Sequence, residues 1–302
     1  MSFALPVPEL DCNGRMLSLE RARIMGIINA TPDSFSGDGL RDHVAAAVAQ
    51  GVSMVAAGAD LLDVGGESTR PGAAPIPVDE QLRRVLPIIE ALAAAVAVPI
   101  AIDTSDPAVM RAAIAAGAGL INDVRALRVE GALQAAAELA VPVCLMHMQG
   151  EPGGMQDDPF YDDVVADVHR FLADRLLSCE FAGIERKRLL VDPGFGFGKT
   201  AAHNYRLLAG LRKFVDLGVP VLIGLSRKGM IGTATGHANP KDRAIGSAAA
   251  ALIAVQRGAA IVRTHDVAVT RDALAVWECL RKHAPAASRP THSSAPRWDD
   301  DD

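Results

Sequence analysis

The sequence is poor in aromatic residues and its few cysteines follow no pattern, and both features narrow the class of protein. Phe, Trp and Tyr make up 4% of the 302 residues, so the core must be built from Ala, Val, Leu and Ile. The four cysteines have no CxxC or metal-ligand spacing; they are Cys12, Cys144, Cys179 and Cys279. Thiols scattered through so long a chain favour reduced cysteines in the cytoplasm over a disulfide framework.

Concentrated positive charge and long apolar runs are also absent. The net charge is −6, and no block of Lys and Arg marks a surface for nucleic acid or anionic lipid. Residues 1–10 lack the positive region and continuous apolar core of a signal peptide. The Ala- and Gly-rich runs are interrupted by Gln50, Gln256 or Arg257, which favours buried helices over membrane spans. We therefore expect a cytoplasmic protein that binds neither nucleic acid nor membrane.

The sequence does contain an apolar run of strand length that recurs eight times, with helical patterns between the runs. The runs are residues 24–30, 61–65, 98–104, 119–124, 142–148, 189–194, 220–226 and 259–266. Near-continuous apolar strands that alternate with helices are typical of parallel strands buried on both faces. Eight such units predict an α/β protein with a closed (β/α)8 TIM barrel. The alternative is an open Rossmann-like sheet, but no GxGxxG follows the first run.

Two flanking segments differ from this repeat. Asn13-Gly14 lies between two short runs and is the strongest local signal for a tight turn, so we expect a short N-terminal β-hairpin at the bottom of the barrel. After His283 the chain is rich in Pro, Ser and charge and cannot bury enough apolar area to become ordered. No internal linker is evident. The sequence predicts one domain over residues 1–283 and a disordered tail over residues 284–302.

Polar side chains follow the ends of the predicted strands. In barrels of this kind the C-terminal ends of the strands hold the active site. The residues at these ends are Asn29, Asp63, Asp103, Asn122, Asp123, His147, Asp192, Ser226, Arg263 and His265. Any single one could be a structural polar residue, and we interpret His147 as a histidine oriented by its neighbours in the wall. Convergence from all eight strands predicts a binding site.

The candidate residues divide into two sets by charge. The cationic set is Arg70, Lys228, Arg263 and His265, with Arg227 nearby. It suits phosphate or diphosphate, which arginine binds bidentately. The second set is Asp103, Asp192, Asn122 and Asn29. Carboxylates and amides in a dry pocket suit a heterocycle with adjacent N–H donors. Asp63 either belongs to this set or positions Thr69 and Arg70, and the sequence leaves both roles open.

Residues 189–200 contain GxGxG followed by Lys199-Thr200, which superficially suggests a phosphate-binding loop. The P-loop pattern GxxxxGK[ST] is absent. We interpret Asp192 as the strand-end ligand and Phe197 as a packing surface for a substrate. The glycines allow close approach of the backbone.

Taken in order, the strand-end motifs resemble those of the dihydropteroate synthase family, the folate-pathway enzymes targeted by sulfonamides. The motifs are IMGIINATPDSFS, DVGGESTRPGA, IDTS, INDVRAL, LMHMQG, DPGFGFGKT, GLSRKGMIG and RTHD, over residues 24–283. The resemblance implies a transferase that condenses 6-hydroxymethyl-7,8-dihydropterin pyrophosphate with p-aminobenzoate. The products are 7,8-dihydropteroate and pyrophosphate.

The resemblance also implies roles for individual residues. The pterin positions are Asp103, Asn122, Asp192 and Lys228, and the pyrophosphate positions are Thr69, Arg70, Arg263 and His265. The p-aminobenzoate positions are Phe35, Pro71 and Ser226. Asn29 matches a ligand of the cofactor Mg2+. We expect Asp103, Lys228, Arg263 and His265 to be catalytic. A homodimer built through the last helices is implied by the resemblance alone.

Two stretches depart from the family pattern, and two other functions compete with the synthase. Residues 34–40 read SFSGDGL where family members often read SFSDGG, which leaves the metal-side role of Asp33 or Asp38 open. Gly229 stands where many family members carry a serine that helps hold the p-aminobenzoate carboxylate. The competing functions are a methyltetrahydrofolate-binding methyltransferase barrel and a non-catalytic pterin-binding paralogue. The first leaves Arg70, Arg263 and His265 without a diphosphate, and the second predicts loss of catalytic residues that are all present.

Overall fold

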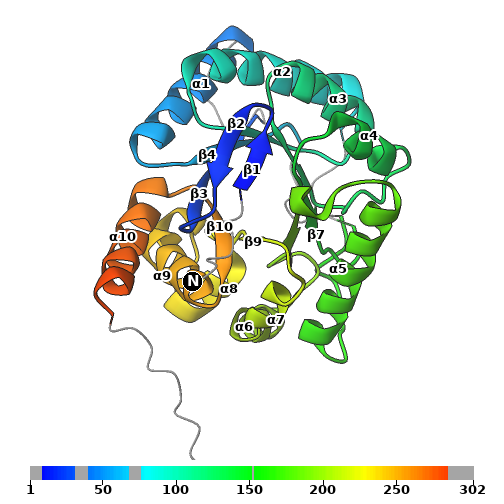
Figure 1. Ribbon diagram of the computed structural model, residues 1–302. Helices are drawn as coiled ribbons and strands as arrows, with labels where there is room; N and C mark the ends of the chain where they lie inside the picture. Colours follow the sequence, from blue (N-terminus) through cyan, green and yellow to red (C-terminus); the bar gives the residue numbers. More distant parts are fainter. Residues whose placement is uncertain (1–8, 31–39, 68–75, 152, 285–302) are drawn as a thin grey trace, which may run out of the picture.

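Eight parallel strands close into a barrel in the computed structural model, which describes residues 9–30, 40–67, 76–151 and 153–284 (Figure 1). In chain order they are β3 Arg23–Asn29, β4 Leu61–Gly65, β5 Ile100–Asp103, β6 Leu120–Asp123, β7 Val143–Met146, β8 Leu189–Asp192, β9 Val221–Ile223 and β10 Ala259–Thr264. Each pairs with its neighbours in sequence, and β10 pairs with β3 to close the ring. Every predicted run overlaps one of these strands, which confirms the (β/α)8 TIM barrel.

Helices follow the strands and form an outer ring (Figure 1). They are α1 Leu40–Ala56, α2 Val78–Ala95, α3 Pro107–Ala115, α4 Ala132–Leu139, α5 Val164–Phe181, α6 Ala201–Ala209, α7 Arg212–Val215, α8 Gly229–Thr235, α9 Ala244–Gln256 and α10 Val267–His283. Local sequence sets their ends. Asp106 caps α3 by accepting the N–H groups of Ala108 and Val109 at 2.8 and 3.2 Å. Gly117, with φ of 110°, ends the same helix in a backbone conformation that side chains disfavour.

The predicted hairpin is present and covers the N-terminal end of the barrel. Strand β1 (Glu9–Cys12) pairs antiparallel with β2 (Arg15–Ser18) through a turn in which Asn13 and Gly14 have φ of 58° and 81°. The Asn13 amide donates to the Ala118 carbonyl at 3.1 Å, and the Arg15 guanidinium donates to the Val98 carbonyl at 2.7 Å. Both carbonyls precede barrel strands, so the hairpin lies across the barrel opening (Figure 1).

One apolar side chain from every barrel strand packs against this hairpin. These side chains are Met25, Leu61, Ala101, Leu120, Cys144, Leu190, Leu222 and Ile261. Because side chains alternate along a strand, residues two positions farther also point into the barrel. They are Ile27, Asp63, Asp103, Asn122, Met146, Asp192, Gly224 and Arg263. The first of these two layers is wholly apolar, whereas five of the eight positions in the second are polar or charged. The second layer lies nearer the C-terminal ends of the strands and is called the charged layer.

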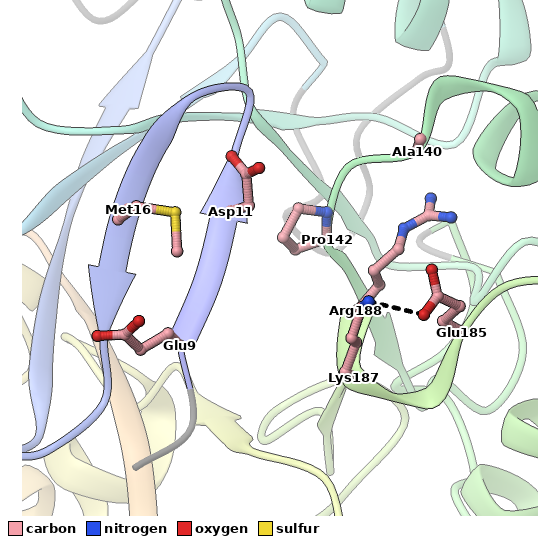
Figure 2. A pocket seen from close by; sticks show the side chains of 8 residues that line it. All are labelled: Glu9, Asp11, Met16, Ala140, Pro142, Glu185, Lys187 and Arg188. Carbon is pink, nitrogen blue, oxygen red and sulfur yellow. Dashed lines mark ion pairs between the residues drawn. The ribbon is translucent and has the colours of Figure 1, made fainter. Parts of the chain in front are cut away.

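A cavity of about 340 Å³ lies at the N-terminal end, between the hairpin and the segment that leads into β8 (Figure 2). Its lining includes Glu9 and Asp11 of β1 and the ion pair of Lys187 with Glu185 at 2.7 Å. No residue predicted for the functional site lines it. It lies at the end of the barrel opposite to the charged layer.

The predicted domain bounds and the lengths of the helices can be compared with the structure. The assignment of residues 1–283 to one domain stays a prediction, and the predicted tail from residue 285 onward lies outside the described residues. No helix within the described ranges has both the length and the apolar composition to cross a membrane.

Candidate active site

The charged layer is organised around Arg263 of β10. Its Nε donates to Asp63 Oδ2 at 2.5 Å, and its Nη2 donates to Asp103 Oδ2 at 2.9 Å. Asp63 Oδ2 also accepts the Asn122 amide at 3.1 Å. Asp63 is fully buried and does not face solvent. Its carboxylate instead holds Arg263 and Asn122 in place. The two predicted sets of residues are therefore interleaved, because Arg263 pairs directly with two carboxylates.

The protonation of Asp103 is set mainly by its burial. Burial raises the pKa of Asp103 to about 7, and the negative charge of Asp63 acts in the same direction, while Arg263 opposes both. For Arg263 itself, burial lowers the pKa, but Asp63 and Asp103 outweigh burial and raise it. The arginine therefore stays charged, and Asp103 changes its charge near neutral pH.

Asp192 lies at the end of β8, with the same group of charges. Its Oδ1 accepts the Gly194 N–H at 2.7 Å. Burial raises the pKa of Asp192, and the Gly194 N–H, Lys228, Lys199 and Arg263 act against burial. Arg263 and Lys228 both act on the pKa of Asp192. Asp192, predicted to bind the pterin, and Arg263, predicted to bind the diphosphate, therefore face the same space inside the barrel.

Lys228 precedes α8 and pairs with Phe197. The Lys228 ammonium lies 4.3 Å from the centre of the Phe197 ring and donates to the Phe195 carbonyl. Burial lowers the pKa of Lys228 to about 8, although the carboxylate of Asp192 raises it. We call this contact the Phe197–Lys228 pair. It places a cation and an aromatic face beside Asp192.

Ser226 and His265 are joined at the ends of β9 and β10. The Ser226 hydroxyl lies 3.0 Å from His265 Nδ1 and accepts the His265 backbone N–H at 3.1 Å. Arg227, expected near the cationic set, forms an ion pair at 2.6 Å with Asp266, the residue after His265. Its backbone is left-handed, with φ of 59°.

The remaining predicted residues are Asn29 and four residues that the structure does not describe. Asn29 is the last residue of β3 and pairs in register with Gly65 of β4. Four predicted residues lie outside the described residues: Phe35, Thr69, Arg70 and Pro71. The described part of the chain contains no group of three or more His, Cys, Asp or Glu side chains that could hold a metal ion.

Two strand-end residues are structural, and one buried residue was missed. Asp123 accepts the N–H groups of Arg125 and Leu127 at 2.8 and 2.7 Å and so shapes its own loop. His147 lies in the wall with Nδ1 2.9 Å from the Lys199 ammonium. Lys199, which the sequence suggested only as part of a false phosphate-loop signal, is 3% exposed. The sequence signal for Lys199 is its position directly after GFGFG, in the loop that follows β8.

A closed barrel whose strands end on a shared cluster of carboxylates, amides and cations is typical of a (β/α)8 enzyme that binds a charged small molecule. A family model described as pterin binding enzyme matches residues 25–265. The dihydropteroate synthase of Escherichia coli K12 is 50% identical over 270 residues, which cover 89% of this chain and 95% of that protein. The chain therefore belongs to the dihydropteroate synthase family of pterin-binding enzymes.

Solved structures agree in fold and sequence. The Xanthomonas albilineans dihydropteroate synthase with 4-aminobenzoic acid is 58% identical, has a TM-score of 0.88, and the match covers 93% of this chain and 100% of that one. The same enzyme in complex with 7,8-dihydropteroate is 56% identical with a TM-score of 0.85, over 92% of this chain and 100% of that one. The resemblance drawn from the strand-end motifs is confirmed.

Proposed function

We propose that the chain condenses 6-hydroxymethyl-7,8-dihydropterin pyrophosphate with p-aminobenzoate to give 7,8-dihydropteroate and pyrophosphate. The observation that carries the proposal is the bridge of Arg263 between Asp63 and Asp103, beside Asp192 and Lys228. Similar enzymes have been solved with 4-aminobenzoic acid and with 7,8-dihydropteroate, which supports both substrate classes.

The pterin ring is bound by Asp192, Asn122 and Lys228. Gly194 occupies only Oδ1 of Asp192, so the second carboxylate oxygen can accept from the ring N–H groups. The Asn122 amide is fixed by Asp63 at 3.1 Å, which orients its carbonyl oxygen. The Lys228 ammonium donates to an acceptor of the ring.

The diphosphate is bound by the cations on the other side of this cluster. Arg263 uses Nε and Nη2 for the two carboxylates and has further N–H groups for phosphate oxygens. His265 belongs to this subsite, and Arg70 and Thr69, which lie outside the described residues, are expected to complete it. Mg2+ commonly binds through one or two protein oxygens, several waters and substrate phosphates. The single amide oxygen of Asn29 fits that mode and would hold the ion, which would supply positive charge to the diphosphate.

The reaction is a dissociative substitution at the pterin methylene carbon. The bond from that carbon to the diphosphate oxygen breaks, and its electron pair leaves with the diphosphate. The amine nitrogen of p-aminobenzoate forms the new bond to carbon and releases its proton to water. Ionised Asp103 stabilises the positive charge that develops on the pterin, and a fixed charge of this kind is usually the largest catalytic contribution. The neutral aryl amine needs no strong base.

The p-aminobenzoate lies at the edge formed by Ser226 and the Phe197–Lys228 pair. Phe35 and Pro71 are expected to contact the same substrate. The ring packs on Phe197, and the carboxylate accepts backbone N–H groups at the start of α8. This arrangement keeps the amine directed at the methylene carbon.

The surface and the thiols support a homodimer and a cytoplasmic location. The exposed faces of α9 and α10 carry Ile245, Ile253, Val276 and Leu280 at helical spacing. Ile245 and Val276 are 80% and 70% exposed, so a homodimer that covers these helices buries apolar surface. All four cysteines are free thiols, which supports a reducing cytoplasm.

The test is pyrophosphate release from the pterin pyrophosphate in the presence of p-aminobenzoate and Mg2+. We expect release that depends on p-aminobenzoate, with 7,8-dihydropteroate as product. Tight pterin binding without release would identify a non-catalytic paralogue. Methyl transfer from methyltetrahydrofolate to cob(I)alamin would identify the corrinoid methyltransferase.

A further inference from the structure

Lys199 is buried below the proposed site and its ammonium has three partners. Nζ lies 2.9 Å from the Gly194 carbonyl, 2.9 Å from the Phe197 carbonyl and 2.9 Å from His147 Nδ1. An ammonium has three N–H donors, so these acceptors use all of them. Burial lowers the pKa of His147 to about 2, and Lys199 acts in the same direction, so the imidazole is neutral and its Nδ1 can accept. Burial also lowers the pKa of Lys199 well below its usual value, and Lys228 acts in the same direction, while Asp192 opposes both. The three acceptors around Nζ favour the charged form.

The segment above Lys199, residues 193–198, is called here the glycine loop. Its backbone lies directly against the end of β7. A Cβ atom on Gly194 would lie 1.8 Å from the His147 carbonyl oxygen, and one on Gly198 would lie 2.4 Å from that of Gln149. Both glycines have positive φ, 69° and 62°. The loop is therefore fixed between the β7 end and the Lys199 ammonium.

The two carbonyls that Lys199 binds belong to residues that contact the proposed substrate groups. Gly194 accepts from Lys199 through its carbonyl and donates its N–H to Asp192 at 2.7 Å. Phe197 accepts from Lys199 through its carbonyl, and its ring contacts the Lys228 ammonium. The buried Lys199 ammonium is thus linked through Gly194 to Asp192, the carboxylate proposed to bind the pterin. It is linked through Phe197 to the proposed p-aminobenzoate edge.

We propose that Lys199 is a positioning residue, which holds the glycine loop so that Asp192 and the Phe197–Lys228 pair are set for both substrates at once. The proposal rests on the proposed synthase function. Lys199 also acts on Asp192 through its charge, because it is one of the cations that oppose the effect of burial on the pKa of that carboxylate. Loss of the charge then raises the pKa of Asp192 and weakens pterin binding at low pH.

The experiment compares Lys199→Met with the wild type. Displacement of reacting groups by about 1 Å costs on the order of 100-fold in rate, so we expect kcat/KM to fall about 30- to 100-fold. We expect KM to rise for both substrates, and the affinity for the pterin pyrophosphate alone, measured by calorimetry, to fall more steeply than that of the wild type as the pH is lowered. The matched control is Lys187→Met at the opposite end of the barrel, where the side chain is 74% exposed, and its constants should equal those of the wild type.

A folded Lys199→Met protein with wild-type constants and an unchanged pH dependence of pterin binding would overturn the proposal, even if it melts at a lower temperature. If this variant does not fold, His147→Gln and His147→Leu decide, because only glutamine retains an acceptor for Lys199. We expect KM for both substrates to rise about 10-fold in His147→Leu and less in His147→Gln; equal effects would overturn the proposal. Absence of turnover in the wild type would refute the synthase function, whereas the variant-to-wild-type ratio of pterin affinity tests Lys199 separately.

Discussion

The two ends of the barrel are built from the same strands and differ in what the strands present. At the N-terminal end Leu190 packs against the hairpin, and two residues farther along β8 Asp192 faces the proposed substrate space. Ile261 and Arg263 repeat this pattern on β10. The apolar layer supplies burial energy and a rigid base, and the charged layer above it holds the groups proposed for catalysis. Substitutions of Leu190 and Asp192 should therefore separate stability from substrate binding, whereas substitution of Arg263 should change both stability and catalysis.

The largest effect is expected for Arg263→Met, because this change leaves Asp63 and Asp103 buried without their cation. Removing one partner of a buried ion pair typically costs about 3 kcal/mol of stability. We expect that loss in the free energy of unfolding, measured in urea, together with a fall of about 10³-fold in kcat/KM. Adding Asp63→Asn to this variant should restore part of the stability and none of the activity. Loss of activity with unchanged stability would contradict the ion-pair account.

The comparison of layers is sharpest at Leu190 and Asp192. Leu190 is fully buried, so Leu190→Ala should cost about 3 kcal/mol of stability through a cavity and leave KM and kcat close to the wild type. Asp192→Ala should abolish pterin binding at a smaller cost in stability. Denaturant unfolding and calorimetric titration with the pterin pyrophosphate measure both quantities. Equal loss of pterin binding in the two variants would remove the distinction between the layers.

The value of kcat/KM should be high only over a narrow range of pH. Because the pKa of Asp103 is raised to about 7 and the ionised form is active, kcat/KM should rise with pH through that value. Because the pKa of Lys228 is lowered to about 8 and the charged form is active, kcat/KM should fall above that value. Asp63→Asn removes a negative charge that raises the pKa of Asp103, so the acid limb should move to lower pH. A shift to higher pH would contradict this electrostatic coupling.

The smallest effect is expected at Gly229. A Cβ atom at this position would meet no other atom within 4 Å, so Gly229→Ser should fit without strain. A serine hydroxyl at the start of α8 can donate to the p-aminobenzoate carboxylate, and one added hydrogen bond of about 1 kcal/mol lowers KM roughly fivefold. Steady-state kinetics with varied p-aminobenzoate measure the change. An equal change in KM for the pterin pyrophosphate would place the effect elsewhere.

Much of this architecture follows from local sequence. The apolar runs, Asn13-Gly14 and the Asp106 cap predict strands, hairpin and helix start because each depends on neighbouring residues only. The contacts of Arg263 could not be predicted, since Asp63 and Asp103 lie 200 and 160 positions away and meet it only when the barrel closes. The contact of Lys199 with His147 could not be predicted either, because the two residues lie 52 positions apart.

The most direct test measures pyrophosphate release by the wild type, Leu190→Ala and Asp192→Ala side by side, with both substrates and Mg2+. The account predicts release by the wild type and by Leu190→Ala that requires p-aminobenzoate, and none by Asp192→Ala. Release by Asp192→Ala at the wild-type rate would contradict the assignment of the charged layer as the pterin site.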